Sequence, residues 1–388
     1  MRKIAINIWV YLSSIIIIVA SAIGNIYKIP FLRDDIHATI IDLAVLAIIV
    51  SGLVIGVVTQ NRDSKYSKTV LAFLAVAILT LLVSGSRYGP AALLVGSLYI
   101  LRWAAYGFFP FFSRILQNSP KGRHLPLIVC LVIIIVSVAQ YLWQPDIRHL
   151  AVAEWDPHYY RVVGSFLDPG FTGLLLVFSL VFFTIKPRIH SQIVRTLLWG
   201  INYLAFAFTY SRSSYLGYLA AMAYISWRRR SIKFFLATTL LLAITIPILP
   251  RASDGDGVKL ERKFSVSARF DSWKNSLIIF FQNPILGVGF NTYRYAQRAY
   301  KIEPDSKWLK SHAGAGADSS LLFVAATTGM VGLTAYLYYL RHLFSYSGLR
   351  YYLIPLLFHS FFLNSLFYPY VMFWLALMLG EELKHQPA

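Results

Sequence analysis

The sequence has few charged residues, and acidic residues are the scarcest of them. Among its 388 residues, 17 are Asp or Glu and 36 are Lys or Arg, so charged residues make up 14% of the chain. A soluble domain is typically about a quarter charged, which argues against an ordinary soluble protein. Hydrophobic residues make up 57%, and the mean hydropathy is +0.59. This composition is typical of an integral membrane protein.

Other features are also missing from the sequence. The single cysteine, Cys130, lies inside an apolar run, so disulfide bonds are excluded. No nucleic-acid-binding motif accompanies the net charge of +19, which argues against a nucleic-acid partner. Tandem repeats, heptads and low-complexity linkers are absent. We therefore expect a single membrane domain over residues 1–388.

Apolar runs near the length of a bilayer span recur from end to end. At roughly 17–25 residues for each span, with a few shorter ones, they predict about twelve transmembrane helices. The runs cover residues 4–24, 39–59, 69–85, 90–112, 125–144, 171–185, 194–210, 214–227, 232–249, 319–340, 349–367 and 370–383. The predicted fold class is an all-α, polytopic membrane protein with one large loop between the ninth and tenth spans.

Lys and Arg are concentrated in alternate loops, which predicts that both termini lie in the cytoplasm. The large loop, residues 251–317, then faces the periplasm, although it too is rich in basic residues. They are Arg251, Lys259, Arg262, Lys263, Arg269, Lys274, Arg294, Arg298, Lys301, Lys307 and Lys310. A basic surface at the outer edge of the bilayer suits an anionic, lipid-bound substrate.

Arg212 lies between two long apolar runs with almost no loop around it. A charge near membrane depth costs several kcal/mol unless it is paired or solvated. One interpretation is a side chain that extends to the lipid headgroups at a tight hairpin. The interpretation we favour is a guanidinium that points into a wet cavity and binds phosphate.

An amphipathic helix is predicted near residues 267–282. Phe270, Trp273, Leu277, Ile278 and Phe281 recur at intervals of three or four and form one apolar stripe. We expect this helix to lie on the membrane surface, with Arg269 near its N-terminal end, where an anion is favoured. An ordinary interfacial helix with solvated charges is the alternative.

Two further segments place polar residues at the expected outer face. Residues 145–170 hold Arg161 and Asp168 among aromatic residues, which is typical either of an interfacial aromatic belt or of an oligosaccharide-binding surface. Residues 311–322 hold His312 and Asp318. Asp318 is placed either to cap the next span or to take a proton from a sugar hydroxyl, and His312 has a titration range suited to the same role.

Taken in order, these segments resemble the O-antigen ligase and O-antigen polymerase superfamily, over roughly residues 155–380. The resemblance rests on GSFLDP at 164–169, TYSRS at 209–213, SARFDSW at 267–273, NPILGVGF at 283–290, DSSLL at 318–322 and TGMVGL at 328–333. The resemblance implies inverting, GT-C-like glycosyl transfer at the periplasmic face of the bacterial inner membrane. It implies no metal or other cofactor, and a donor glycan on undecaprenyl diphosphate.

The resemblance also implies roles for individual residues. Arg212 and Arg269 match the family's diphosphate-binding arginines. Ligases of the family carry a His-Asn or similar pair where this chain has Asp318 and Ser319, and the acidic residue favours a polymerase-like member. His312, six residues earlier, is the alternative base and keeps a ligase open. The residues expected to line the glycan groove are Arg161, Asp168, Trp273, Arg294 and Arg298.

The predicted function is an O-antigen or exopolysaccharide polymerase, with membrane lipid and a chain-length regulator as further partners. A ligase that passes glycan to lipid A core or to protein is the first alternative. A lipid-linked oligosaccharide flippase is the alternative from another class. It predicts paired repeats and polar residues at mid-membrane, for which Arg102 and His359 are the candidates and Asp42 is the main acidic one.

Overall fold

The computed structural model describes residues 2–31, 33–57, 63–153, 156–186, 188–252, 256–260, 264–302, 308 and 316–384. Its long elements are α1 (Arg2–Ile23), β1 (Lys28–Phe31), β2 (Arg33–Thr39), α2 (Ile40–Val54), α3 (Ser64–Val83), α4 (Pro90–Asn118), α5 (Leu125–Trp143), α6 (Pro169–Ile185), α7 (Gln192–Ala207), α8 (Arg212–Arg229), α9 (Ile232–Ile248), α10 (Phe264–Gln282), α11 (Tyr293–Ala299), α12 (Ser320–Leu343), α13 (Arg350–Ser360) and α14 (Pro369–Glu382). Short 3-10 turns are η1 (Gly85–Tyr88), η2 (Arg148–Ala153), η3 (Gly164–Phe166), η4 (Asp256–Val258) and η6 (Ser365–Phe367).

Apolar helices dominate the fold. Among the described residues, five helices are long and apolar enough to cross a membrane, namely α1, α3, α4, α5 and α12. The shorter helices α2, α6 and α9 are also apolar. The prediction of a helical membrane protein is therefore confirmed in its architecture, while the count of twelve spans stays a prediction. The run 349–367 is not one helix, because α13 ends at Ser360 and η6 follows it.

A small sheet is the exception to the all-α prediction. Strands β1 and β2 pair antiparallel, with Lys28 opposite Thr39 and Ile29 opposite Ala38. Thr39 then caps α2 in a capping box with Asp42, whose carboxylate accepts from the Thr39 N–H at 3.0 Å. The apolar run predicted from residue 39 therefore starts as helix only at Ile40.

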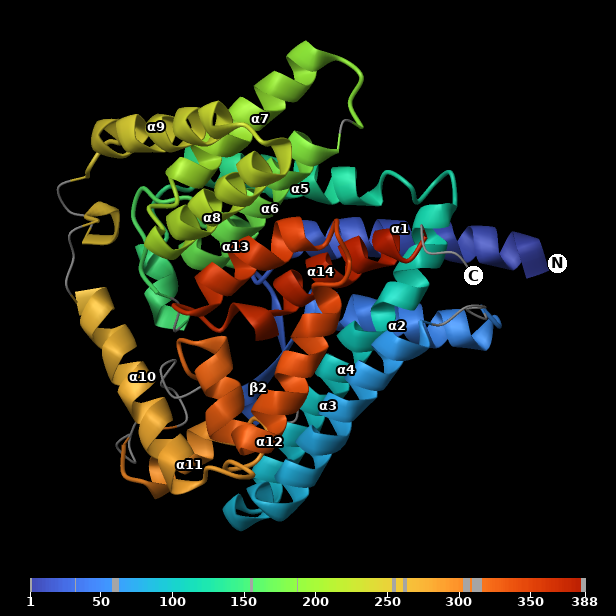
Figure 1. The fold of residues 1–388 in the computed structure, drawn as a ribbon, viewed down its shortest axis with the longest axis vertical. Helices are drawn as coiled ribbons and strands as arrows, with labels where there is room; N and C mark the ends of the chain where they lie inside the picture. Colours follow the sequence, from blue (N-terminus) through green and yellow to red (C-terminus); the bar gives the residue numbers. More distant parts are fainter. Residues whose placement is uncertain are drawn as a thin grey trace.

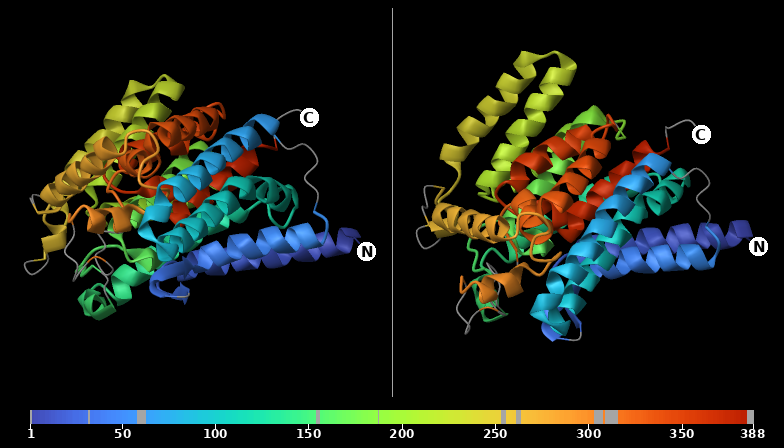
Figure 2. Two further views of the ribbon diagram at one scale, coloured as in Figure 1. Left: turned by 90° about the horizontal axis from the view of Figure 1, so that it is seen from below. Right: turned by 60° about the horizontal axis from the view of Figure 1, so that its bottom comes forward.

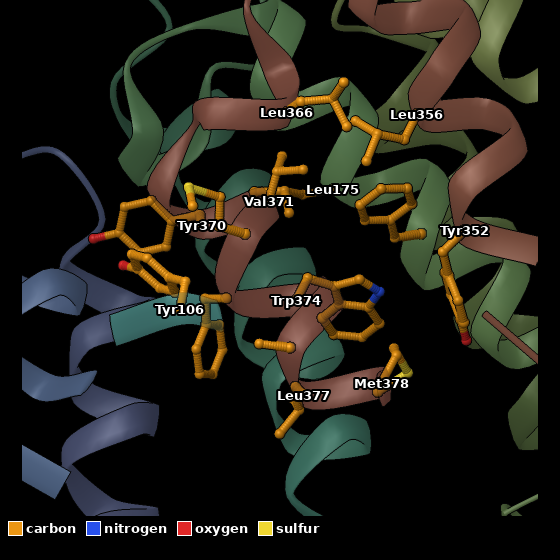
Figure 3. Packing of buried hydrophobic residues seen from close by; sticks show 14 of the residues in the cluster. Tyr106, Leu175, Tyr352, Leu356, Leu366, Tyr370, Val371, Trp374, Leu377 and Met378 are labelled. Carbon is orange, nitrogen blue, oxygen red and sulfur yellow. The ribbon is translucent and has the colours of Figure 1, made fainter. Parts of the chain in front are cut away.

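The C-terminal helices lie in the middle of the bundle. Helix α14 packs against α4, α13 packs against α8 and α6, and α12 packs against α3 (Figure 1). Trp374 of α14 is a central core residue, with its ring 6.0 Å from Tyr352 of α13 and 6.3 Å from Phe178 of α6 (Figure 3). These contacts bring α6, α8, α13 and α14 together.

Helix α12 is broken at Gly329, and residues 284–289 fill the break. Gly329 has φ 65 and ψ −165, so the helical hydrogen bonds of Met330 and Val331 to Ala326 and Thr327 are lost. Backbone groups of the neighbouring segment replace them: Met330 donates to Pro284, Val331 to Ile285, Val288 to Ala326 and Gly289 to Thr327. Two of the sequence motifs, 283–290 and 328–333, are therefore two sides of one backbone junction.

Helices α10 and α11 lie at one end of the molecule, and the N-terminal end of α1 and the C-terminal end of α14 lie at the other (Figures 1 and 2). Helix α10 also contacts α12. The arrangement places the helix predicted near 267–282 on the opposite side of the bundle from both ends of the chain. Which end faces the periplasm stays a prediction.

Candidate functional site

Arg212 is the first residue of α8, directly after a tight connection from α7. Tyr210 has a left-handed backbone with φ 49, and the Ser211 hydroxyl caps α8 by accepting from the Ser214 N–H. The Arg212 guanidinium donates to the carbonyl of Leu260 at 3.2 Å. The turn therefore presents a cation at the helix start without an intervening loop.

Arg161 lies against this same turn. Its side chain is 5% exposed, and its guanidinium donates to the carbonyls of Thr209 at 3.0 Å and Tyr210 at 3.3 Å. Arg161 is absent from the lining of the pocket described next, although the sequence predicted it in a glycan groove. In the structure, its hydrogen bonds fix the backbone of Thr209 and Tyr210, which precede Arg212 in the turn.

Arg212 and Arg269 line one pocket of about 200 Å³, between the start of α8 and the N-terminal half of α10. The lining residues are Arg212, Ser213, Leu216, Val266, Arg269, Phe270, Trp273 and Phe362. The Arg269 guanidinium lies 5.9 Å from the ring centre of Phe362, and Trp273 lies 6.0 Å from that ring. Two cations thus share a pocket whose other walls are mostly apolar.

The electrostatics of the pocket favour an anion. Burial lowers the pKa of Arg269, the negative charge of Asp318 opposes this, and the positive charge of Arg212 lowers the pKa further. Like charges destabilise each other in a low-dielectric site. A bound anion between the two guanidiniums would offset both their repulsion and their loss of water.

Asp318 precedes α12 and faces this charge cluster. Burial raises its pKa to about 6, Arg269 acts against that rise, and Asp168 adds to it. Its backbone N–H donates to the Ser272 hydroxyl of α10 at 2.9 Å. Among the described residues its carboxylate forms no hydrogen bond or ion pair, and α12, whose N-cap residue is Ser319, has no side-chain cap. Capping therefore does not explain this aspartate.

Asp168 has a different role at the start of α6. Its Oδ1 accepts from the Gly170 N–H at 2.6 Å and from the Phe171 N–H at 3.0 Å, so it caps the helix. Burial raises its pKa, and the N–H of Phe171 opposes that rise. Its charge nevertheless reaches Arg269 and Asp318, since it influences the pKa of each.

The remaining predicted residues are distributed over the α10–α11 region. Trp273 lines the pocket. Arg294 and Arg298 of α11 do not line it. Arg294 donates to the Trp308 carbonyl at 2.7 Å, and Arg298 lies 4.6 Å from the centre of the Trp308 ring. His312 lies outside the residues that the structure describes.

The sequence of residues 196–337 matches the family model described as O-Antigen ligase. Over this segment, the chain is similar to the O-antigen ligase family. The resemblance found in the sequence motifs is thereby confirmed. No curated protein is similar enough to the chain to count as a match.

The O-antigen ligase segment supplies most of the pocket but not all of it. All of the lining residues except Phe362 lie within residues 196–337. Asp318 also lies in this range, whereas Arg161 and Asp168, which do not line the pocket, lie outside it. Phe362 was missed in the sequence because it lies in an apolar run that resembles any core segment.

Where the chain is described, no three His, Cys, Asp or Glu side chains are grouped so as to hold a metal ion.

Proposed function

We propose that this protein is a member of the O-antigen ligase and polymerase superfamily and acts as a polymerase of lipid-linked glycans. It transfers a glycan from an undecaprenyl-diphosphate donor to a hydroxyl of another lipid-linked repeat unit. The proposal includes no metal or other cofactor, as the family resemblance implies. The observation that carries it is the shared pocket of Arg212 and Arg269.

The two arginines bind the diphosphate of the donor. A guanidinium presents paired N–H groups that match phosphate oxygens, and two of them neutralise a diphosphate more completely than one. Negative charge grows on the diphosphate as it leaves, so fixed cations stabilise the transition state more than the ground state. The apolar walls formed by Phe270, Trp273 and Phe362 strengthen this effect by limiting water.

The transfer is a direct displacement at the anomeric carbon of the donor sugar. The acceptor oxygen forms a bond to that carbon while the bond from carbon to the diphosphate oxygen breaks. Undecaprenyl diphosphate leaves with the bonding electron pair, and the hydroxyl proton passes to the Asp318 carboxylate. Displacement from the opposite side inverts the anomeric configuration.

Asp318 is the base in this proposal. A pKa of about 6 leaves it deprotonated at neutral pH but more basic than an ordinary aspartate. Its lack of capping hydrogen bonds leaves the carboxylate available for an acceptor hydroxyl. His312 stays an alternative base, because nothing is described of its position.

The acceptor and donor sugars lie beyond the arginines. Trp273 offers an aromatic face for stacking on a sugar, and Arg294 and Arg298 extend a basic surface along α11. Arg161 and Asp168 contribute mainly by fixing the starts of α8 and α6. Exposed Phe270 and Phe281 of α10, at 60% and 71%, suit contact with membrane lipid.

The site is proposed to face the periplasm, with both termini in the cytoplasm. The support is the distribution of Lys and Arg over the loops, together with the location of α10 and α11 at the end of the molecule away from α1's start. A donor translocated across the inner membrane reaches the pocket from that side.

A ligase is the second candidate, because the matching family model is described as O-Antigen ligase. A ligase transfers the same donor to lipid A core or to protein. Deleting the gene separates the two functions. Single repeat units attached to lipid A core indicate a polymerase, and complete loss of attached glycan indicates a ligase.

The diphosphate-binding role is tested with Arg212→Ala and Arg269→Ala. Each variant is expected to lose chain extension by at least about 100-fold, with normal amounts of protein in the membrane. The Lys variants are expected to recover only a small part, because a single ammonium cannot form the paired hydrogen bonds. Polymer length is read from gels of surface glycan.

The matched control is Arg148→Ala. Arg148 is an exposed arginine that pairs with Asp146 at 2.7 Å, and exposed pairs of this kind contribute about 0–1 kcal/mol. This variant is expected to make polymer of normal length. Polymer of normal length in the Arg212→Ala strain would contradict the diphosphate-binding role.

A further inference from the structure

His359 of α13 is a buried imidazole at the junction of several chain segments that lead to the pocket. Its side chain is 0% exposed. Nδ1 lies 2.6 Å from the Ser365 hydroxyl, while Nε2 lies 3.1 Å from the Gly170 carbonyl and 3.2 Å from the Ser213 hydroxyl. The imidazole is thus in hydrogen-bonding contact on both of its nitrogens.

The partners determine how the ring is protonated. The carbonyl of Gly170 can only accept, so Nε2 must carry a hydrogen. In a neutral imidazole, Nδ1 is then an acceptor, and the Ser365 hydroxyl donates to it. A buried imidazole with one donor and one acceptor nitrogen, each matched to a partner, has one fixed orientation.

Each partner of His359 lies within three residues of a residue of the site. The Gly170 N–H donates to the cap residue Asp168, Ser213 follows Arg212 and itself lines the pocket, and Ser365 lies three residues after Phe362, which also lines it. Beyond Ser365, the Leu366 N–H donates at 3.1 Å to the hydroxyl of Ser320, the first residue of α12 after Asp318 and Ser319. One imidazole therefore links the starts of α6 and α8 with the segment behind α12.

Helices α6 and α8 approach each other closely beside the imidazole. A side chain at Gly173 of α6 would collide with the hydroxyl of Ser214, which also donates to the Gly170 carbonyl at 3.0 Å. Helices α6 and α8 therefore approach at a position where hydrogen bonds, and not bulky side chains, set their relative position. Phe362, in turn, is the ring that faces the Arg269 guanidinium.

We propose that His359 is a positioning residue for the diphosphate pocket, acting through Ser213 on Arg212 and through the 360–366 segment on Phe362. It does not touch the substrate. The inference rests on the proposed function, because it assigns His359 to the same transfer reaction. Displacements of about 1 Å in a catalytic site are sufficient to lower rates by about 100-fold.

The test compares three variants in purified protein, with transfer from a synthetic undecaprenyl-diphosphate oligosaccharide as the assay. His359→Phe keeps the ring volume but removes both hydrogen-bonding atoms, and is expected to lower kcat by about 100-fold. His359→Gln can still donate to the Gly170 carbonyl and is expected to recover to within about tenfold of the natural protein. Tyr352→Phe removes another buried polar group of α13, a hydroxyl with no hydrogen-bond partner among the described residues, and is expected to retain full activity.

A purely structural role is distinguished by combining His359→Phe with Arg212→Lys. If His359 acts through Arg212, its loss is expected to cost much less in the Arg212→Lys background than in the natural protein. Independent, multiplicative losses would overturn the inference. Full activity of His359→Phe would overturn it as well.

Two further measurements keep the outcomes separate. If His359→Phe fails to accumulate, Ser365→Ala leaves the imidazole in place and removes the hydroxyl that lies 2.6 Å from Nδ1 and, at 3.4 Å, near the Leu363 carbonyl. It is expected to lower kcat by about tenfold. Normal kcat in that variant would contradict the proposal. If instead Arg212→Ala and Arg269→Ala retain transfer, the proposed function itself fails. If they lose transfer while His359→Phe does not, only the role of His359 fails.

Discussion

The starts of α6 and α12 present two aspartates in nearly the same setting with opposite uses. Each aspartate lies just before an apolar helix, and burial raises the pKa of each. Nearby charges also act on both, Asp156 and Arg161 on Asp168, and Arg269 and Asp168 on Asp318. The Asp168 carboxylate accepts from two backbone N–H groups, whereas the Asp318 carboxylate accepts from none in the part of the chain that the structure describes. A carboxylate bound to the backbone stabilises the fold, and one without such partners is available for chemistry.

The largest expected effect comes from Asp318→Asn. If Asp318 is the base, transfer falls by at least about 100-fold, because the amide cannot accept the proton. The amount and thermal stability of the protein are expected to stay unchanged, since the carboxylate caps nothing. Transfer by purified protein and thermal unfolding in detergent measure the two quantities. A mild loss of transfer would show that Asp318, like Asp168, has a structural role and is not the base.

The second expected effect is a dependence of the rate on pH. A base acts in its deprotonated form, and the pKa of Asp318 is raised to about 6. The rate should therefore rise through about pH 6 and level off above it, with a loss of about tenfold at one pH unit below the pKa. A rate that is constant across this range would assign the proton transfer to another group.

Asp168→Ala is expected to lower the stability of the protein and to have little direct effect on glycan transfer. Loss of the cap on α6 should lower the free energy of unfolding by about 1 kcal/mol. Asp168→Asn is the control, because asparagine caps helices as well as aspartate does. Thermal unfolding in detergent should separate the Ala variant from both the Asn variant and the natural protein.

The smallest expected effect is a change in the pH profile of Asp168→Asn. The negative charge of Asp168 raises the pKa of Asp318, so its removal should shift the acidic limb of the profile to lower pH. Transfer at neutral pH should stay close to normal. An acidic limb that stays at the same pH, or shifts to higher pH, would contradict the expected effect of the Asp168 charge on the pKa of Asp318.

The sequence predicted the cations of the site better than the rest of it. Arg212 was identifiable because a charge between two apolar runs is costly, and Arg269 because it lies on an amphipathic stripe that the structure forms as α10. Both signals come from neighbouring residues in the sequence. Neighbouring residues do not distinguish Asp168 from Asp318, because a plausible helix start follows each of them. Only the backbone geometry shows which of the two carboxylates caps its helix.

Long-range partners account for the other differences. Arg161 contacts carbonyls 48 and 49 residues away, so its sequence neighbours give no sign of its role. His359 was noticed as a deep polar residue, but its partners come from α6, α8 and η6. The hairpin of β1 and β2 and the end of α13 at Ser360 likewise depend on tertiary contacts that override apolar patterns.

The broken helix α12 has a consequence for how substrates enter. Because the backbone of residues 284–289 replaces the missing hydrogen bonds at Gly329, the C-terminal end of α10 is anchored in the bundle. The same junction places the following segment against the inner side of α12, so that the floor beneath α10 consists of main-chain hydrogen bonds and does not depend on side-chain identity. A tilt of the N-terminal half of α10 about this end would move Arg269 away from Arg212 and widen the pocket between them.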